Sequence, residues 1–365
     1  MKKFSKIIVA VLAIAMLSVS FAGCGLVEDT ETVEKVKIQK ETMLTVGDDI
    51  EVSGAYYGWY FENAYMTAYS EASQAAQAEA QANSAAEVVS DSAADSAAQS
   101  SAQLAENSAS EPAPAPAPED IKVDIEKVKK DAIDDIVTVK MACKKAKEAG
   151  IELSDKDYAN ITMQADSIRS QLVSGYSQFG DISYSDILLA MNTNIETLNQ
   201  VVEDQYYASL YYASLVSEDY VTVKHILVMY GEEQRTKDEA KALADDIKAQ
   251  LDGGADFDEL MNKHSEDAKD ASGNFASYTF TKDGAYVQPF KDMAFSLKEG
   301  EVSTPVNVED SYSGYHILKR VPVSVSDIAA SLENSEKIEA EQEKLSKDVK
   351  VKESKKISYY SEARN

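Results

Sequence analysis

Two histidines are the residues of this chain whose type and spacing best suit a chemical site. His225 and His316 lie in segments that both read His-Ile-Leu, and the chain has 3 histidines in all. Side chains alternate across a β-strand, so two such strands paired in one sheet would put both rings on one face. A lone histidine on an apolar strand is more often a satisfied core residue. Two at matching positions weaken that interpretation and favour a polar site.

Five short motifs surround these histidines in a fixed order between residues 221 and 323. An opening His-Ile-Leu-Val and a helix precede Phe-x-x-Leu-x-x-x-x-Ser-x-Asp at 257–267. Then come Pro-Phe-x-x-Met-Ala-Phe at 289–295, Gly-Glu-Val-Ser-x-Pro-Val at 300–306, and a closing Gly-Tyr-His-Ile. Each motif alone is weak, but together they resemble the parvulin-type peptidyl-prolyl isomerases. The resemblance implies a four-stranded antiparallel sheet with surrounding helices.

The same resemblance implies a catalytic group. His225 and His316 match the paired histidines at the floor of the parvulin site, and Asp267 matches the polar position beside the twisting peptide bond. Ser313 is the best match for a hydroxyl that bonds the histidines. Rotation about an Xaa-Pro bond crosses a barrier of ~20 kcal/mol without breaking a bond. It therefore calls for no metal, cofactor or nucleophile.

The resemblance also implies a pocket that binds the proline ring. Phe290 and Tyr286 match its lining, and Phe275 falls near another apolar wall position. Two departures border this pocket. The usual Gly-Gly-x-Leu-Gly-x-Phe turn is replaced by the sequence of residues 272–280, and the loop at 307–313 is longer. An active isomerase and a holdase that binds clients with little turnover therefore both stay open.

The chain begins with a targeting segment at residues 1–23. Three lysines and a short apolar run precede Phe-Ala-Gly-Cys, which resembles a bacterial lipoprotein cleavage box ending at Cys24. A diacylated Cys24 would anchor the chain stably to the outer face of the cell membrane. The alternative is an ordinary signal peptide cut near Ala22. Lipidation would leave Cys143 without a disulfide partner, and its place on an apolar helical stripe favours a buried hydrophobe.

The rest of the chain surrounds the isomerase-like stretch at 218–325. We expect a tether at 24–42 and two short strands and an aromatic helix within 43–70. We expect a disordered insertion rich in Ala, Ser and Pro at 71–120, because it has few large apolar residues. Helices at 121–217 and 326–365 would complete a mainly α-helical chaperone domain of the SurA and trigger-factor type. This arrangement resembles the secreted foldase lipoproteins of the PrsA type.

A tyrosine-rich run at 206–215 has two interpretations. Tyr207, Leu210, Tyr211 and Leu215 share one helical face, which could either cradle apolar client segments or pack between helices.

The formal net charge of −27 argues against nucleic acid as a partner. The expected partners are unfolded or newly exported polypeptides and, through the lipid anchor, the membrane; a homodimer stays open. A solute-binding lipoprotein would need repeated βα units, which the sequence lacks.

Overall fold

The structure, a computed structural model, describes residues 30–94, 121–231, 235–270, 273–309, 313–330, 332, 335–362 and 364. Cys24 and the targeting segment lie outside these ranges. The chain divides into two compact units. We call them the helical unit (1–144, 153–205 and 342–365) and the sheet unit (145–152 and 206–341). The sheet unit therefore interrupts the sequence of the helical unit.

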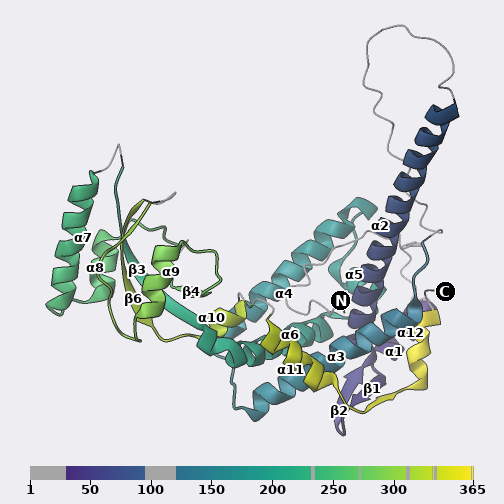
Figure 1. Cartoon of the computed structure of the whole chain (residues 1–365). Helices are drawn as coiled ribbons and strands as arrows, with labels where there is room; N and C mark the ends of the chain where they lie inside the picture. Colours follow the sequence, from purple (N-terminus) through teal and green to yellow (C-terminus); the bar gives the residue numbers. More distant parts are fainter. Residues whose placement is uncertain are drawn as a thin grey trace. The chain divides into compact units, whose positions relative to one another are not determined.

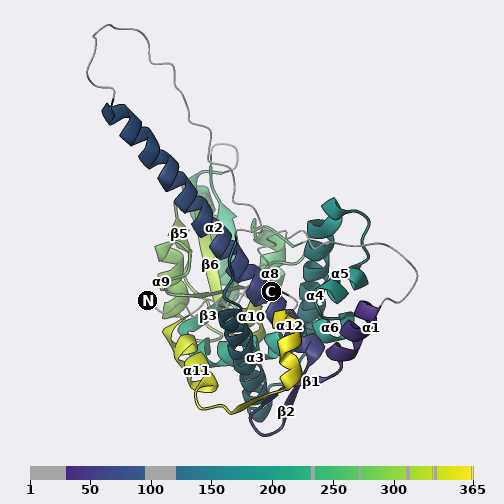
Figure 2. The ribbon, with the colours of Figure 1, turned by 90° about the vertical axis from the view of Figure 1, so that its right-hand side faces the viewer.

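The helical unit contains mostly helices and one small sheet (Figures 1 and 2). In chain order its elements are α1 (Thr30–Gln39), β1 (Thr42–Val46), β2 (Ile50–Ser53), α2 (Gly54–Ala94), α3 (Ile125–Glu148), α4 (Asp155–Tyr176), α5 (Tyr184–Ala190), α6 (Ile195–Val216), β7 (Val351–Glu353) and α12 (Ser358–Glu362). Helices α3 and α6 continue across the boundary into the sheet unit. The hairpin of β1 and β2 confirms the two short strands predicted within 43–70, and a capping box at Ser154 opens α4.

Aromatic residues from the first half of α2 form the centre of the helical unit's core. Tyr57, Phe61 and Trp59 pack with Ile136 of α3 and Tyr360 of α12, all of them buried. The small sheet of this unit includes the C-terminal strand, because β7 pairs antiparallel with β1 and gives the strand order β2-β1-β7. Segments from both ends of the described chain therefore complete one core.

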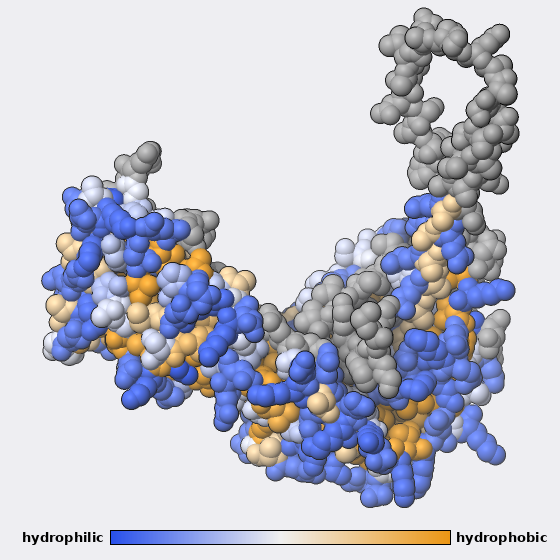
Figure 3. All heavy atoms as spheres, viewed as in Figure 1, coloured by the Kyte–Doolittle hydropathy of each residue, from blue (hydrophilic) through white to orange (hydrophobic). Residues whose placement is uncertain are grey.

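Two expectations for this unit are wrong. The predicted tether includes helix α1, whose Gln39 is buried and donates a hydrogen bond to the Thr193 carbonyl. The predicted disordered insertion is helical up to Ala94, because alanine, glutamine and glutamate have high helix propensity and extend the anchored aromatic half of α2. Figure 3 shows pale orange and blue residues side by side along the coloured part of this extension. The C-terminal segment contains helices at Glu336–Ser346 and Ser358–Glu362 and also strand β7. The remainder of the predicted insertion, 95–120, lies outside the described residues.

The sheet unit is built on a four-stranded antiparallel sheet, as predicted. Its strand order is β4-β3-β6-β5, with β3 (Tyr220–Met229) and β6 (Gly314–Val321) central and β4 (Tyr278–Thr281) and β5 (Val306–Val308) at the edges. Helices α7 (Lys237–Asp252) and α8 (Phe257–His264) pack on one face through Ile226 and Ile317. Helix α9 (Gln288–Ser296) packs on the other face. A capping box at Thr236 opens α7.

The tyrosine-rich part of α6 lies within the sheet unit and is largely packed. Tyr206, Leu210, Tyr211 and Tyr212 are buried, whereas Leu215 is 37% exposed. Two short helices, α10 (Val325–Ala330) and α11 (Glu336–Ser346), follow the sheet in the sequence. The Tyr211 hydroxyl donates a hydrogen bond to Glu341 of α11. These buried side chains support the second interpretation, in which the run packs between helices. No helix in the described ranges is both long and apolar enough to cross a membrane.

Candidate active site

The pairing of β3 with β6 brings the two site histidines together. In the register, His225 lies opposite Leu318 and His316 lies opposite Leu227, so the histidines are diagonal neighbours on one face. Their Nδ1 atoms are 3.0 Å apart, and their rings stack with centroids 5.2 Å apart. Both side chains are buried. The pairing of β3 with β6 therefore sets the positions of both rings.

Asp267 reaches the same group from the segment after α8. The backbone N–H of Glu266 donates to the carbonyl of Leu227, which ties this segment to β3. The Asp267 carboxylate then lies with Oδ2 2.8 Å from His225 Nε2. Its side chain is 15% exposed. Burial alone would raise the pKa of this carboxyl, but hydrogen bonds from His225 and Tyr278 lower it below the ordinary value.

These contacts determine which atom donates in each hydrogen bond of the row His316–His225–Asp267, which we call the polar chain. An ionised carboxylate only accepts hydrogen bonds, so His225 donates from Nε2 to Asp267. In a neutral His225 ring Nδ1 then accepts, and His316 donates to it from its own Nδ1. Each ring thus has one defined tautomer, set by the charge on Asp267.

A cluster of aromatic rings packs against this polar chain, where the resemblance places the proline pocket. The Phe290 ring, on α9, stands edge-on to both histidine rings with centroids 5.6 Å apart. Tyr286 stacks on Phe290 at 5.8 Å and lies 4.4 Å from the Phe280 ring. Phe290 is 5% exposed and Tyr286 is 37% exposed, so Phe290 is the inner residue of the cluster and Tyr286 reaches the surface.

The structure brings His225, His316, Asp267, Phe290 and Tyr286 into one group, but it does not place Phe275 there. Phe275 packs against the apolar cluster on the opposite face of the sheet, because the segment that holds it bridges back to Lys269. Its assignment to the pocket wall is therefore wrong.

Ser313 directly precedes β6. Its carbonyl accepts a hydrogen bond from the backbone N–H of Tyr230. The bond expected from its hydroxyl to the histidines stays a prediction.

Sequence reasoning missed two residues of the site, Tyr278 and Phe280 of β4. The Tyr278 hydroxyl donates to Asp267 Oδ2 at 2.6 Å, and its ring stands edge-on to His225. Phe280 packs against Phe290. The available signal was the alternation Tyr-Thr-Phe, which is typical of a strand with one buried face.

A charged clamp holds the end of β3 beside this group. Arg235 contacts Glu266 with both guanidinium NH groups at 2.7 Å and also donates to the Met229 carbonyl. The Met229 N–H in turn donates to Glu266. Burial raises the pKa of Glu266, and the bonds from Arg235 and Met229 bring it below its ordinary value. The clamp fixes the backbone that precedes Asp267.

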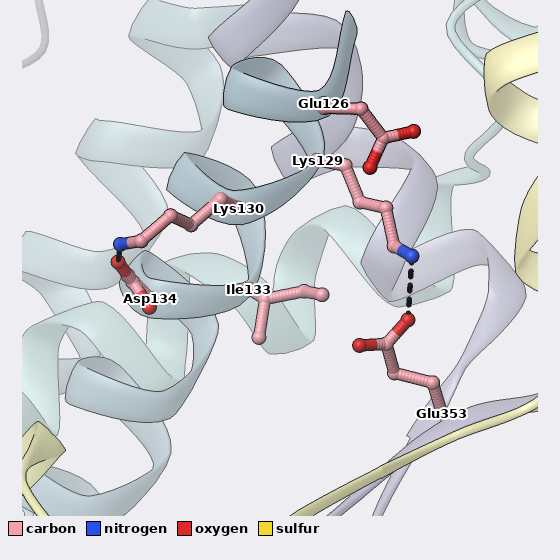
Figure 4. A pocket seen from close by; sticks show the side chains of 6 residues that line it. All are labelled: Glu126, Lys129, Lys130, Ile133, Asp134 and Glu353. Atoms are coloured by element: carbon pink, nitrogen blue, oxygen red, sulfur yellow. Dashed lines mark hydrogen bonds and ion pairs between the residues drawn. The ribbon is translucent and has the colours of Figure 1, made fainter.

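A separate depression in the helical unit carries no comparable chemistry. It is lined by residues of α3 and by Glu353, as Figure 4 shows. Lys129 is paired with Glu353 and Lys130 with Asp134, so its cations are neutralised.

The fold and the site define a parvulin-type peptidyl-prolyl isomerase domain. In agreement, residues 209–324 match the family described as PPIC-type PPIASE domain. Foldase protein PrsA of a Geobacillus species is 30% identical over 243 residues, which cover 62% of this chain and 79% of that protein. The chain belongs to the PrsA foldase family.

Other relatives carry the same name. Foldase protein PrsA of Caldanaerobacter subterraneus is 29% identical over 200 residues, 54% of this chain, and the chain spans 58% of that relative's length. The crystal structure of PrsA from Bacillus subtilis is 21% identical, with 61% of this chain and 86% of that chain covered and a TM-score of 0.25. With so low a TM-score, the family assignment rests on the sequence relatives.

Proposed function

We propose that this chain is an extracytoplasmic foldase whose sheet unit isomerises Xaa-Pro bonds in exported polypeptides. Its helical unit would hold unfolded client segments, and a lipid on Cys24 would anchor it to the membrane. The observation that carries the isomerase proposal is the chain His316–His225–Asp267 lying against the aromatic pocket of Phe290.

The pocket suits the apolar half of the reaction. A proline ring seated on Phe290 under the Tyr286 rim would bury its methylene groups and strip water from the preceding amide. Removal of water disfavours the planar amide, whose resonance dipole is well solvated, relative to the twisted form.

The polar chain suits the electrostatic half of the reaction. A planar amide places partial negative charge on its carbonyl oxygen, and twisting reduces that charge. A carboxylate held beside the oxygen therefore destabilises the planar state more than the twisted one. His225 and His316 would keep the carboxylate aimed at this place without themselves transferring a proton.

The test is cis/trans exchange of an Xaa-Pro peptide, followed by NMR with the full-length chain. We expect His225→Ala and Asp267→Ala to lower kcat/KM about tenfold or more, because each removes a charge-assisted hydrogen bond worth ~1.5–3 kcal/mol. His264→Ala is the matched control, since this third histidine ends α8 outside the site. Circular dichroism would verify that each variant folds.

A holdase is the competing outcome. If the wild-type chain prevents aggregation of an unfolded client but does not accelerate exchange, the isomerase proposal fails and the holdase stands. Loss of activity in His264→Ala to the same extent as in His225→Ala would also count against the site.

The anchor needs its own test. Mass spectrometry of the mature chain should find a diacylated N-terminal Cys24, and Cys24→Ser should release the chain from the membrane. An unmodified N-terminus near residue 23 would favour an ordinary signal peptide and a secreted foldase.

A further inference from the structure

Tyr278 contacts the candidate site at three points. Its hydroxyl donates to Asp267 Oδ2 at 2.6 Å. Its ring stands edge-on to His225, with centroids 5.0 Å apart, and edge-on to Tyr286, with centroids 6.1 Å apart. Its backbone is set by β4, in which Tyr278 lies opposite Val223 of β3. The phenol is thus fixed by the sheet rather than by a loop.

The hydroxyl and the His225 ring share one oxygen of Asp267. His225 Nε2 lies 2.8 Å from Oδ2, the atom that also accepts from Tyr278. The backbone N–H of Ala268 is a third donor to the carboxylate. Three donors around a largely buried carboxylate favour its charged form.

No lysine or arginine forms an ion pair with Asp267 within the described part of the chain. Arg235 is paired with Glu266, and Lys269 lies over the Phe275 ring. On α9, which packs on this face, Lys291 donates to the Gly284 carbonyl and Asp292 accepts from Gln288. Among the described residues, the donors to Asp267 are therefore the His225 ring, the Ala268 N–H and the Tyr278 hydroxyl.

We propose that Tyr278 is a positioning residue whose hydroxyl holds the Asp267 carboxylate beside His225 and favours its charged form. This inference rests on the proposed isomerase function, because it assigns Tyr278 a role at that site. It goes beyond that function by naming a residue that positions the carboxylate.

The hydrogen bond from Tyr278 is stronger to an ionised carboxylate than to a protonated one, so its removal favours the protonated form of Asp267. The titration of Asp267 also changes the partner of His225 Nε2, and with 3 histidines in the chain the ring ¹⁵N signals are easily assigned.

The experiment compares Tyr278→Phe with wild type in the full-length chain. Tyr278→Phe removes one oxygen and keeps the ring. Tyr230→Phe is the matched control, because its hydroxyl bonds Asn307 in the same unit rather than Asp267. Aspartate carboxyl ¹³C and histidine ring ¹⁵N shifts are recorded between roughly pH 3 and 7, with Asp267→Asn to assign the carboxyl signal.

We expect Tyr278→Phe to raise the titration midpoint of Asp267 by about one to two pH units, the value of one hydrogen bond to a charged group. Tyr230→Phe should leave the Asp267 midpoint in place.

An Asp267 midpoint equal in Tyr278→Phe and wild type would overturn the inference. If Tyr278→Phe fails to fold, wild type alone provides the test. The Tyr278 ring ¹³Cζ shift must then change at the Asp267 midpoint, and independent midpoints would overturn the inference. A raised midpoint in a chain that catalyses no exchange would instead sink the proposed isomerase and leave the role of Tyr278 in Asp267 ionisation intact.

Discussion

The phenol of Tyr360 donates a hydrogen bond to the carbonyl oxygen of Gly54, 2.7 Å away and 306 positions earlier in the chain. The Tyr360 side chain is completely buried, and its ring packs edge-on against Tyr57. The last helix of the helical unit is thus bonded to the first residue of α2. The sheet unit lies between these two segments in the sequence.

We predict that Tyr360→Phe destabilises the helical unit by about 1–3 kcal/mol, because it leaves the buried Gly54 carbonyl without its donor. Tyr360→Ala should cost about 3–5 kcal/mol through the cavity it creates. Trp59 is the single tryptophan and lies in this core, so its fluorescence during urea unfolding reports the helical unit. Tyr158→Phe, at a residue 53% exposed, is the control. Equal stability of Tyr360→Phe and wild type would show that the bond is not needed.

A second prediction concerns the close approach of α2 to the turn before α6. A Cβ atom built at Gly58 would lie 2.3 Å from the Asn192 carbonyl oxygen. Asn192 has a φ of 54° and is buried, with its amide bonded to Glu62, so it has little freedom to move. Gly58→Ala should therefore lower the free energy of unfolding by about 1–3 kcal/mol despite alanine's higher helix propensity.

Gly231→Ala provides the comparison for Gly58→Ala, because a Cβ there would meet no atom within 4 Å. We expect its unfolding midpoint, followed by circular dichroism, to match wild type within about 0.5 kcal/mol. A Gly58→Ala variant as stable as wild type would mean that α2 can shift away from Asn192.

Elements whose signals are local can be predicted from the sequence. The capping boxes that open α7 at Thr236 and α4 at Ser154 involve side chains within one turn. His225 and His316 could be placed on one face because strand alternation is strict once the strands pair. The place of Asp267 in the site came from the family resemblance rather than from any local pattern.

The missed features depend on contacts between distant segments. Helix α1 has no strong apolar stripe, and Gln39 is held by a carbonyl 154 positions away. Tyr278 reaches Asp267 only through the register of β4 against β3, which the sequence does not specify. Phe275 lies in an irregular segment, where side chains follow no period that would assign a face.

A third prediction is that the sheet unit loses stability as the pH falls, in part through Glu266. The pKa of Glu266 in the folded protein is below the ordinary value. Its contribution to the free energy of unfolding is therefore fully present above the unfolded pKa of about 4.3, and it is lost as the pH falls through the folded pKa. We expect Glu266→Gln to cost about 1 kcal/mol or less at pH 7, because the pair with Arg235 is partly exposed, and nothing measurable at the acid limit.

Histidine ring NMR during urea unfolding measures this loss in the sheet unit, which holds all three histidines. Glu309→Gln is the control, since Glu309 pairs with Lys237 at the surface. If the stability of Glu266→Gln falls with decreasing pH as steeply as that of wild type, other carboxylates account for the effect.

The last prediction concerns the ion pair of Lys140 and Asp204 inside the helical unit. Their N–O distance is 2.6 Å, and both side chains are about nine-tenths buried. Tyr56 donates to the same Asp204 oxygen, and the ammonium of Lys140 lies 3.8 Å from the centre of the Tyr56 ring. Lys140→Met should cost about 3–5 kcal/mol, because it leaves a buried carboxylate without its counter-charge.

The double variant Lys140→Met, Asp204→Leu should recover much of that loss, because two apolar side chains avoid the cost of taking two charges out of water. Trp59 fluorescence during urea unfolding of the two single variants and the double variant gives the coupling energy directly. We expect at least about 1.5 kcal/mol of coupling. Strictly additive losses would mean that the two charges are solvated separately, and the pair could not then be what fixes α3 against α6.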